Sequence, residues 1–460
     1  MNWTQLLNPC RLGNRPARQE LGRSPFNSDH DKITFSGAFR RLAKKTQVHP
    51  LATNDHIHNR LTHSLEVACV GRSLGIRAGQ ILLNQGRLPD QFTPTDIGDI
   101  VQSTCLAHDI GNPPFGHTGE EAIRNWFNND GLEFLEGLQP EEANDLKAFE
   151  GNAQGLRVLT SAEYHPYDGG MRLTYATLAS FIKYPWTSLP AVAGKRPRSS
   201  KFGIFQSELD TFHEIAENVG LKREHGDDWY SRHPLVHLME AADDFCYGII
   251  DLEDGLEMNI LNWDDIFDLL RPVISPGDID QLTRDIAKVG LGRKPPLVRG
   301  KVIAAYVESA ANAFASNEAG LLDGTVTELI PLCDAPIAEA VKAAKDLAKR
   351  DIFSHPRKIE LEIGAYNVIA TLLGVMCRAV TAWVGNPNEI SFRDRRALEL
   401  IGPHTFHPLL EKDPPRPRNE ETPRTSKYLA IMRVIDFISG MTDNYATYLA
   451  KQFAGLGESR

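Results

Sequence analysis

The chain of 460 residues has little of what marks a secreted, disulfide-bonded or β-rich protein. It has six cysteines and no Cys-x-x-Cys pair, which favours reduced core cysteines of a cytoplasmic protein over disulfides or zinc. Its N-terminus lacks a basic start followed by an apolar stretch, so no signal peptide is expected. Alternating runs typical of strands are scarce, and no internal repeat is visible.

Positive charge is also in short supply, since the net charge is −10. This balance excludes a generic binder of polyanions, so positive charge that binds nucleotide must be concentrated locally and supported by a metal. One segment, 366–384, is apolar enough to raise the question of a membrane span. Because it carries Asn367 and Arg378 amid amphipathic sequence, we expect a buried helix and no membrane contact.

The sequence does show the periodicity of apolar residues that is typical of helices. Apolar residues recur at three- and four-residue spacing within 61–69 and again within 369–376. This pattern predicts a mostly α-helical protein. Prolines mark the expected helix breaks, which fall at Asn112-Pro-Pro, Pro185, Pro190 and Pro234.

Three stretches rich in charge, proline or glycine are predicted to be loops, namely 186–201, 221–233 and 411–427. A mobile, solvated loop accounts for each of them. For the first and the third, a second interpretation stays open. Their basic residues, Lys201 among them, could form a rim that meets nucleotide phosphate or nucleic acid.

The most informative residues are His63, the adjacent His108 and Asp109, and Asp243. Two imidazoles and two carboxylates suit one divalent cation that keeps open positions for water and substrate. An adjacent His-Asp pair alone is a weak signal, but 108–120 places four potential catalytic groups within thirteen residues. Both residues of the pair can face one ion where a helix ends, and the glycine and prolines that follow supply that end. Asp109 could bridge the metal and a nucleophilic water.

Six blocks of sequence resemble, in order, those of the HD-domain deoxynucleoside triphosphate triphosphohydrolases, in their bacterial dGTPase branch. The blocks span nearly the whole chain. They are RSPF at 23–26, FSGAFRRLAKKTQV at 35–48, RLTHSLEV at 60–67, HDIGNPPFGHTGE at 108–120, MEAADDFCY at 239–247 and IDFISGMTD at 435–443. The resemblance implies an all-α fold of the HD-domain metal-dependent phosphohydrolase type, with a large helical body and appended C-terminal helices.

For the domain organisation, the resemblance implies one large α-helical domain over 1–460. Within it, 30–260 is the approximate catalytic core, and the helices of 261–460 complete the site and make oligomer contacts. The implied assembly is a homo-oligomer, a hexamer or another even-numbered form. Single-stranded DNA or a dNTP is a candidate effector.

The implied reaction is hydrolysis of dNTPs, dGTP included, to deoxynucleoside and inorganic triphosphate. The resemblance implies one divalent metal ion per site, Mn²⁺ or Mg²⁺. Histidine-containing sites also accept Ni²⁺, Co²⁺ or Fe²⁺, because affinity does not itself select the physiological metal. Two alternatives stay open. One is an HD-type nucleotidase or phosphodiesterase with another phosphate ester as substrate, and the other is a dNTP-sensing oligomer that binds nucleic acid.

Arg60 lies three residues before His63 and hence on the same helical face. A guanidinium beside a metal is repelled unless an anion lies between them. A substrate phosphate is the natural anion, since arginine can grip it with two hydrogen bonds. A pair with Glu66 along the helix is the alternative.

His117 and Glu120 are expected to handle protons. A carboxylate bonded to one ring nitrogen fixes the tautomer and raises the basicity of the other nitrogen. In the family that the chain resembles, the matching histidine acts at the scissile phosphate and the matching glutamate orients it. His117 therefore either positions the attacking water or protonates the departing 5′ oxygen. The alternative is a histidine that caps a helix beside a surface glutamate.

Asp243, Tyr247 and Asp251 are spaced four apart, so one helix face presents a carboxylate, a phenol and a carboxylate in line. The spacing favours Asp243 over its neighbour Asp244 as the metal ligand. By resemblance, Tyr247 packs against the deoxyribose where a 2′-hydroxyl would sit, and Asp251 binds the sugar 3′-hydroxyl.

Three further residues enter through the resemblance alone. Lys183 and Tyr184 match residues that contact the phosphate chain, and Gln47 matches one near the sugar 3′-hydroxyl. The proline that follows Tyr184 is expected to end a helix and to leave both side chains at the mouth of a cleft.

Overall fold

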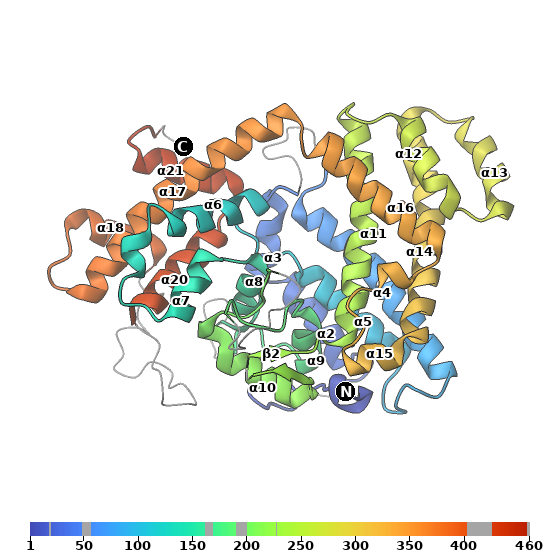
Figure 1. Cartoon of the computed structure of the whole chain (residues 1–460), viewed down its shortest axis with the longest axis horizontal. Helices are drawn as coiled ribbons and strands as arrows, with labels where there is room; N and C mark the ends of the chain where they lie inside the picture. The colour runs from blue at the N-terminus through green and yellow to red at the C-terminus, as the bar shows by residue number, and fades with distance from the viewer. Residues whose placement is uncertain are drawn as a thin grey trace.

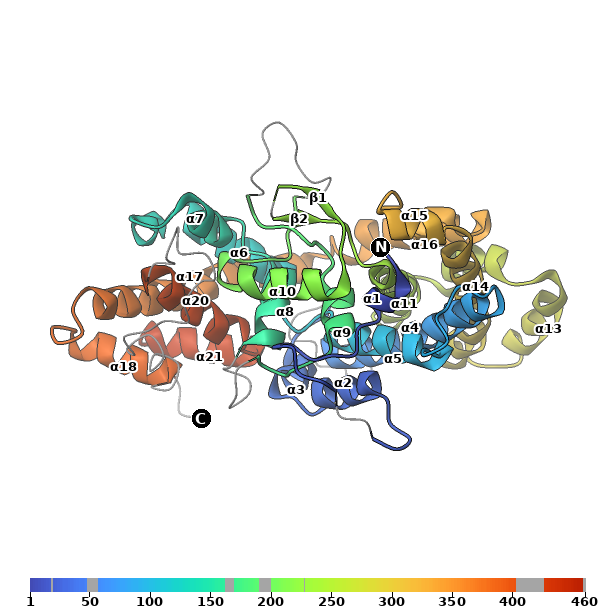
Figure 2. The ribbon, with the colours of Figure 1, turned by 90° about the horizontal axis from the view of Figure 1, so that it is seen from below.

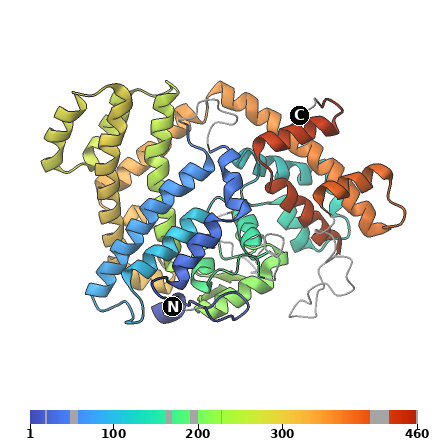
Figure 3. The ribbon, with the colours of Figure 1, turned by 180° about the vertical axis from the view of Figure 1, so that it is seen from behind.

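The computed structural model of the chain describes residues 1–17, 20–47, 57–161, 169–189, 200–226, 228–402 and 426–457. Helices dominate these residues. The only sheet among them is an antiparallel pair, β1 (Arg223–His225) and β2 (Trp229–Tyr230). The predicted all-α fold class is therefore confirmed. Figures 1, 2 and 3 agree in showing an elongated molecule, with α13 towards one end and α18 towards the other.

The buried apolar side chains form two clusters, and α8 contributes to both. Besides α8, the helices of the first cluster are α1 (Trp3–Leu6), α2 (Pro25–Thr34), α3 (Gly37–Arg41), α4 (Arg60–Asn84), α5 (Pro94–Ala107), α9 (Tyr175–Phe181), α10 (Leu209–Val219), α11 (Pro234–Glu257), α12 (Trp263–Leu270), α13 (Pro276–Ile286), α14 (Lys294–Ser316), α15 (Glu318–Asp323) and α16 (Ala335–Leu347). Those of the second are α6 (His117–Asn128), α7 (Pro140–Lys147), α8 (Gly151–Thr160), α17 (Pro356–Gly385), α18 (Phe392–Ile401), α20 (Ser426–Ser439) and α21 (Asp443–Phe453).

Helices α4 and α5 pack closely because glycines line their contact. A Cβ atom on Gly75 would lie 2.9 Å from Gly98 Cα, and one on Gly71 would lie 2.4 Å from Cys105 Sγ. Both helices begin with a capping box, which satisfies backbone N–H groups of the first turn. Helix α11 packs against this pair. The three helices thus form a close-packed frame for the side chains that they carry.

Helix α17 contains the apolar segment 366–384. It is the one described helix that is long and apolar enough to cross a membrane, by length and composition alone. Its inner face packs against α6, α18, α20 and α21, and Ile369, Leu372, Leu373 and Met376, which carry the apolar periodicity of 369–376, are fully buried. Since 39% of its apolar window is buried, the helix is partly rather than wholly enclosed. This packing is consistent with a soluble protein.

The hairpin β1–β2 corrects the prediction of a loop over 221–233. Aromatic residues hold the hairpin to the body of the protein. The Tyr230 ring packs edge-on against Phe212 at 5.2 Å, and the Trp229 ring lies 6.3 Å from Trp186. The many charged residues of 221–233 favoured a solvated loop, so these two aromatic contacts were not predicted. Of the other predicted loops, 190–199 and 403–425 lie outside the described residues, and α20 begins at 426.

Candidate functional site

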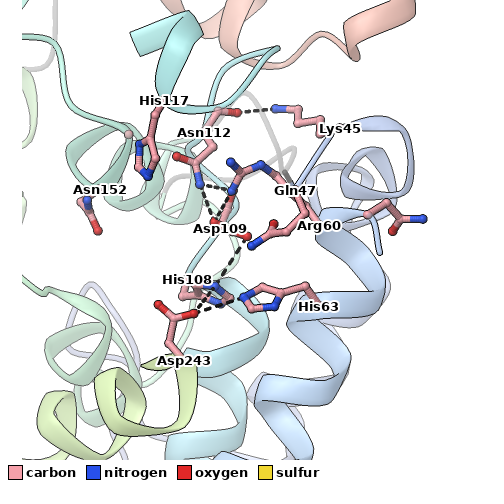
Figure 4. Close-up of polar contacts among 12 residues, drawn as sticks. Lys45, Gln47, Arg60, His63, His108, Asp109, Asn112, His117, Asn152 and Asp243 are labelled. Carbon is pink, nitrogen blue, oxygen red and sulfur yellow. Dashed lines mark hydrogen bonds and ion pairs between the residues drawn. The ribbon is translucent and has the colours of Figure 1, made fainter. Parts of the chain in front are cut away.

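The predicted ligand residues come from three helices that meet at one point. His63 lies on α4, His108 caps the end of α5, and Asp243 lies on α11 (Figure 4). His63 Nε2 is 3.1 Å from Asp243 Oδ1, and His108 Nε2 is 3.6 Å from the same oxygen. One ligand atom from each of these residues lies within 4.8 Å of the other two. A single cation can therefore contact all three.

Hydrogen bonding leaves three atoms of this cluster without partners, and His63 Nδ1 is one of them. His108 Nδ1 lies 2.6 Å from the carbonyl oxygen of Cys105, an acceptor, so the ring proton resides on Nδ1. The other nitrogen, His108 Nε2, is buried without a hydrogen-bond partner, as is Asp109 Oδ2 at 3.5 Å from it. Buried polar atoms are costly when unpaired. A divalent cation would satisfy both atoms, so these residues fit the expected metal.

The carboxylates of the cluster stay charged despite their burial. Burial would raise the pKa of Asp243, but His108 and His63 outweigh burial and lower that pKa. Burial would also raise the pKa of Asp109, and the Arg60 charge, the strongest opposing influence, lowers it. Two ionised carboxylates beside two imidazoles form a donor set suited to a divalent metal.

Arg60 is buried, and its Nη1 atom forms an ion pair with Asp109 Oδ1 (Figure 4). Asn112 donates a hydrogen bond to the same oxygen. The alternative pairing with Glu66 is wrong, because Glu66 instead approaches His58, with 3.4 Å between Oε2 and Nε2. Asp109 thus lies beside the guanidinium, and the expected contact of Arg60 with a substrate phosphate stays a prediction. Arg60 orients Asp109, while it also lines the cavity described below.

His117 and Glu120 lie on the first turn of α6 and contact one another. Glu120 Oε2 accepts a hydrogen bond from His117 Nδ1 at 2.7 Å, and Oε1 accepts one from the Gly151 backbone at 2.7 Å. Burial would raise the pKa of Glu120, but the bond to His117 is the strongest influence that lowers it. The His117 side chain is 71% exposed, and its ring lies on the side of the site away from His63 (Figure 4). The carboxylate thus holds a solvent-facing imidazole.

Tyr247 and Asp251 follow Asp243 along one face of α11, as the spacing predicts, and all three line the cavity. Tyr247 accepts a hydrogen bond from Gln47 at 2.9 Å, and its ring centre is 4.9 Å from that of His63. Asp251 Oδ1 is buried without a partner. Burial, then the charges of Asp254 and Asp243, raise the pKa of Asp251 well above its ordinary range.

The rival carboxylate Asp244 points to a different partner. Its Oδ1 atom lies 2.7 Å from Lys345 Nζ on α16, whereas Asp243 Oδ1 faces both imidazoles. The group of residues whose ligand atoms come together contains Asp243 and neither Asp244 nor Asp109, but Asp109 Oδ2 still lies 3.5 Å from His108 Nε2. This difference favours Asp243 at the metal.

The metal-ligand cluster opens into a cavity of about 450 Å³, whose lining includes Ala348 of the first apolar cluster and Phe115 of the second. Five of its lining residues are cationic and come from distant parts of the chain. They are Arg60, Lys183, Lys201, Lys345 and Lys358. Phe353, Asn152 and Thr118 also line it. The size suits a small-molecule ligand, and the cations favour an anionic one.

Lys183 reaches this cavity, but Tyr184 is not among its lining residues. Helix α9 ends at Phe181, before both residues, so the expected helix end next to Pro185 is corrected. Lys183 Nζ is 3.5 Å from Glu240. Burial would lower the pKa of Lys183, but Glu240 and Asp243 outweigh burial and raise it. The Tyr184 ring instead packs 5.6 Å from that of Trp186, and its phosphate contact stays a prediction.

Sequence reasoning missed the cavity residues of α16, α17 and the turn between them. Lys345 and Lys358 occur in charged, amphipathic sequence, where a solvent-facing lysine is the ordinary expectation. Lys358 also has a local partner, Glu362, one turn along α17. No short-range pattern identifies such residues, because only the fold brings them to the cavity.

Comparison with known proteins identifies the family. The model of the HD domain family matches residues 60–183, which begin at Arg60 and include His63, His108 and Asp109. A Pseudomonas aeruginosa protein named deoxyguanosinetriphosphate triphosphohydrolase-like protein is 48% identical over 99% of both chains. The chain belongs to the deoxyguanosinetriphosphate triphosphohydrolase-like family of HD-domain proteins. The predicted family and HD fold are thereby confirmed.

More distant members of this family also match nearly all of the chain. A Synechocystis protein with the same name is 37% identical over 99% of this chain and 100% of its own length. A Yersinia pestis protein named deoxyguanosinetriphosphate triphosphohydrolase is 31% identical over 92% of both chains. The similarity therefore extends well beyond the HD match and includes Asp243, which lies outside 60–183.

Proposed function

We propose that this protein hydrolyses deoxynucleoside triphosphates, dGTP among them, to deoxynucleoside and inorganic triphosphate. The names of its relatives point to a hydrolase and to this substrate class. One observation carries the proposal. The buried, unpaired His108 Nε2 and Asp109 Oδ2 atoms belong to residues that line a cavity with five cationic side chains. That combination suits a metal ion and a polyphosphate bound side by side.

His63, His108, Asp109 and Asp243 would hold one divalent metal ion. Mn²⁺ or Mg²⁺ is proposed, and Ni²⁺, Co²⁺ or Fe²⁺ would suit the same imidazole and carboxylate donors. When bound, such an ion supplies charge stabilisation to the α-phosphate. Arg60 keeps Asp109 oriented and ionised in this arrangement.

The triphosphate would be held by lysines that come from separate segments of the chain. Lys183 is placed by Glu240, Lys345 by Asp244, and Lys358 by Glu362. Each carboxylate keeps the ammonium group of its lysine near the cavity. It also neutralises part of the positive charge that the lysine offers to a phosphate. The proposed phosphate contacts of Lys183 and Tyr184 come from the family resemblance, and the contacts of Lys345 and Lys358 from the lining of the cavity.

His117 would handle the proton of the reaction. Because Glu120 occupies Nδ1, the Nε2 atom of the exposed ring is the one that can face substrate. From there it can either orient the attacking water or donate a proton to the departing 5′ oxygen. Glu120 positions the ring and is itself held by the Gly151 backbone.

Tyr247 and Asp251 are expected to select deoxyribonucleotides. We expect Asp251→Ala to lower kcat/KM for dGTP, because the buried 3′-hydroxyl would lose its partner. An unsatisfied buried hydroxyl costs about 1–3 kcal/mol, which is roughly five- to 150-fold. We expect Tyr247→Ala to raise activity towards GTP relative to dGTP, because it opens space at the 2′ position. Steady-state kinetics with both nucleotides measures these effects.

Tyr247→Phe is the matched control for this prediction. It keeps the ring and loses the hydrogen bond from Gln47. If sterics exclude the 2′-hydroxyl, the phenylalanine variant still rejects GTP. Equal use of dGTP and GTP by the unmodified protein would contradict the sugar assignment and favour a broader HD phosphohydrolase.

The proposed activity is tested by product analysis. The protein is incubated with each dNTP singly and in mixtures, with Mn²⁺ or Mg²⁺, and the products are separated by chromatography. Intact triphosphate and deoxynucleoside in equal amounts are expected. Release of single phosphates or pyrophosphate indicates a nucleotidase or another phosphohydrolase instead. Salt-dependent binding of single-stranded DNA with no turnover indicates the binding oligomer.

The assembly and division of the chain are part of the same proposal. We infer a single domain over 1–460, with a catalytic core near 30–260 and a C-terminal part, 261–460, that completes the site. Cavity residues such as Lys345 and Lys358 support that role for the C-terminal part. A cytoplasmic homo-oligomer, hexameric or otherwise even-numbered, with single-stranded DNA or a dNTP as effector is the proposed working form.

A further inference from the structure

One buried carboxylate near the C-terminus binds two segments that face the cavity. Asp443 is the first residue of α21 and is 2% exposed. Its Oδ1 atom accepts a hydrogen bond from the Phe115 backbone at 2.9 Å. Its Oδ2 atom accepts from the Thr46 backbone at 2.9 Å and from the Thr46 hydroxyl at 2.5 Å. Residues 45–47 and the turn 112–117 are thus joined through one side chain.

Lys45 makes a second connection between the same parts of the chain. Its buried Nζ atom donates to the Asn112 carbonyl at 2.6 Å, shown in Figure 4, and to the Ser439 carbonyl at 2.5 Å. Ser439 is the last residue of α20. The Lys45 carbonyl in turn accepts from the Arg60 backbone at the start of α4. The end of α20 and the beginning of α21 therefore clamp the turn 112–117, which leads into α6.

The clamped turn has an unusual backbone. Phe115 has a φ of +65° and Gly116 a φ of +59°, both in the left-handed region that a phenylalanine rarely adopts. Gly116 lies against Arg60, since a Cβ atom there would be 2.6 Å from Nη2. The next residue is His117, which begins α6. Holding the Phe115 N–H group therefore fixes the backbone two residues before the proposed proton-handling residue.

We propose that Asp443, assisted by Lys45, is a positioning residue that sets His117 and Gln47 relative to the metal cluster. Asp443 does not line the cavity, so it acts through the two segments that it binds. Gln47 follows Thr46 directly and bonds to Tyr247, which gives the second path from the carboxylate to the substrate. The inference rests on the proposed dNTP hydrolysis for its catalytic meaning.

Asp443→Asn in the full chain tests the inference. An asparagine has one acceptor oxygen, so it cannot serve both Phe115 and Thr46. We expect kcat for dGTP with Mn²⁺ to fall by about 10- to 100-fold, because a displaced reacting group is costly. Metal content and KM should change little. Hydrogen–deuterium exchange should become faster in the peptide that covers 112–118.

Asp29→Asn is the matched control. Asp29 is also fully buried, accepts from the Thr174 backbone at 2.8 Å and its hydroxyl at 2.7 Å, and does not line the cavity. It should lower stability and leave kcat comparable to that of the unmodified protein. Lys45→Met, which keeps chain length but loses the ammonium group, should act like Asp443→Asn and serves if that variant does not fold.

The outcomes separate this inference from the proposed function. Unchanged kcat in Asp443→Asn, or an equal loss in Asp29→Asn, overturns the positioning role. If the unmodified protein hydrolyses no dNTP, the proposed function fails, while the exchange measurement still applies. Unaltered exchange over 112–118 in Asp443→Asn then overturns the clamp itself, and faster exchange there supports it.

Discussion

Asp243→Ala is expected to remove the metal ion and abolish hydrolysis while the fold persists. The carboxylate is the one group that both imidazoles approach, at 3.1 Å from His63 and 3.6 Å from His108. His63→Ala and His108→Ala should also lower the metal content and the rate of hydrolysis, because each removes one of the two nitrogen donors of the proposed site. Elemental analysis of the purified variants, together with circular dichroism, measures metal content and fold separately. Full metal content in all three would contradict the assignment.

Asp244→Asn is the matched control for this prediction. It removes a carboxylate from the adjacent position of α11, where Oδ1 pairs with Lys345 rather than with an imidazole. We expect this variant to retain the metal. If Asp244→Asn loses the metal and Asp243→Ala retains it in full, Asp244 rather than Asp243 is the metal ligand. The comparison isolates ligand geometry, since the two changes remove the same charge one residue apart.

The candidate metal cluster could be predicted from the sequence because its signals are local. The pair His108 and Asp109 precedes a glycine and two prolines, and that end of α5 brings both residues to the cluster. The four-residue spacing of Asp243, Tyr247 and Asp251 likewise places them on one face of α11. In both cases the backbone geometry follows from a few neighbouring residues.

Pairings between distant segments could not be predicted in this way. The ion pair of Arg60 with Asp109 was not expected, because only the fold brings the end of α5 beside the start of α4, and the phosphate contact of Arg60 stays a prediction. Lys345 reaches the cavity from α16 only through the packing of that helix on α11. Asp443 is remote in sequence from both segments that it binds. Such contacts depend on the whole fold rather than on short-range periodicity.

The fold class followed from helical periodicity, whereas the hairpin and the ends of some helices did not. In 221–233, charged residues outnumber the two aromatic residues that anchor β2, so composition favoured a loop. Pro185 was expected to end a helix, but α9 already ends at Phe181. A proline indicates that a helix does not continue through it, but it does not indicate at which earlier residue the helix ends.

His117→Ala is expected to retain metal and nucleotide binding while the chemical step slows by about 10²-fold or more, as for other lost acid or base groups. The ring is solvent-facing and stands apart from the cluster of ligand atoms, so its removal should leave the metal in place. Single-turnover rates with saturating dGTP measure the chemistry, and equilibrium binding with a non-hydrolysable analogue measures affinity. An unchanged single-turnover rate would contradict a proton-handling role.

Glu120→Gln distinguishes the ring itself from its orientation. The glutamine keeps an acceptor for the Gly151 backbone but lacks the charge that holds His117 Nδ1, so an intermediate loss of rate is expected. His225→Ala, which removes a histidine that packs edge-on against Trp229 away from the cavity lining, should leave the rate unchanged. The pH profile then assigns the role of His117. A histidine that must donate a proton to the departing 5′ oxygen loses activity as the pH rises, whereas one that must accept a proton from water loses activity as the pH falls. If His117→Ala removes neither limb of the profile, another group controls proton transfer and Glu120 has only a structural role at the start of α6.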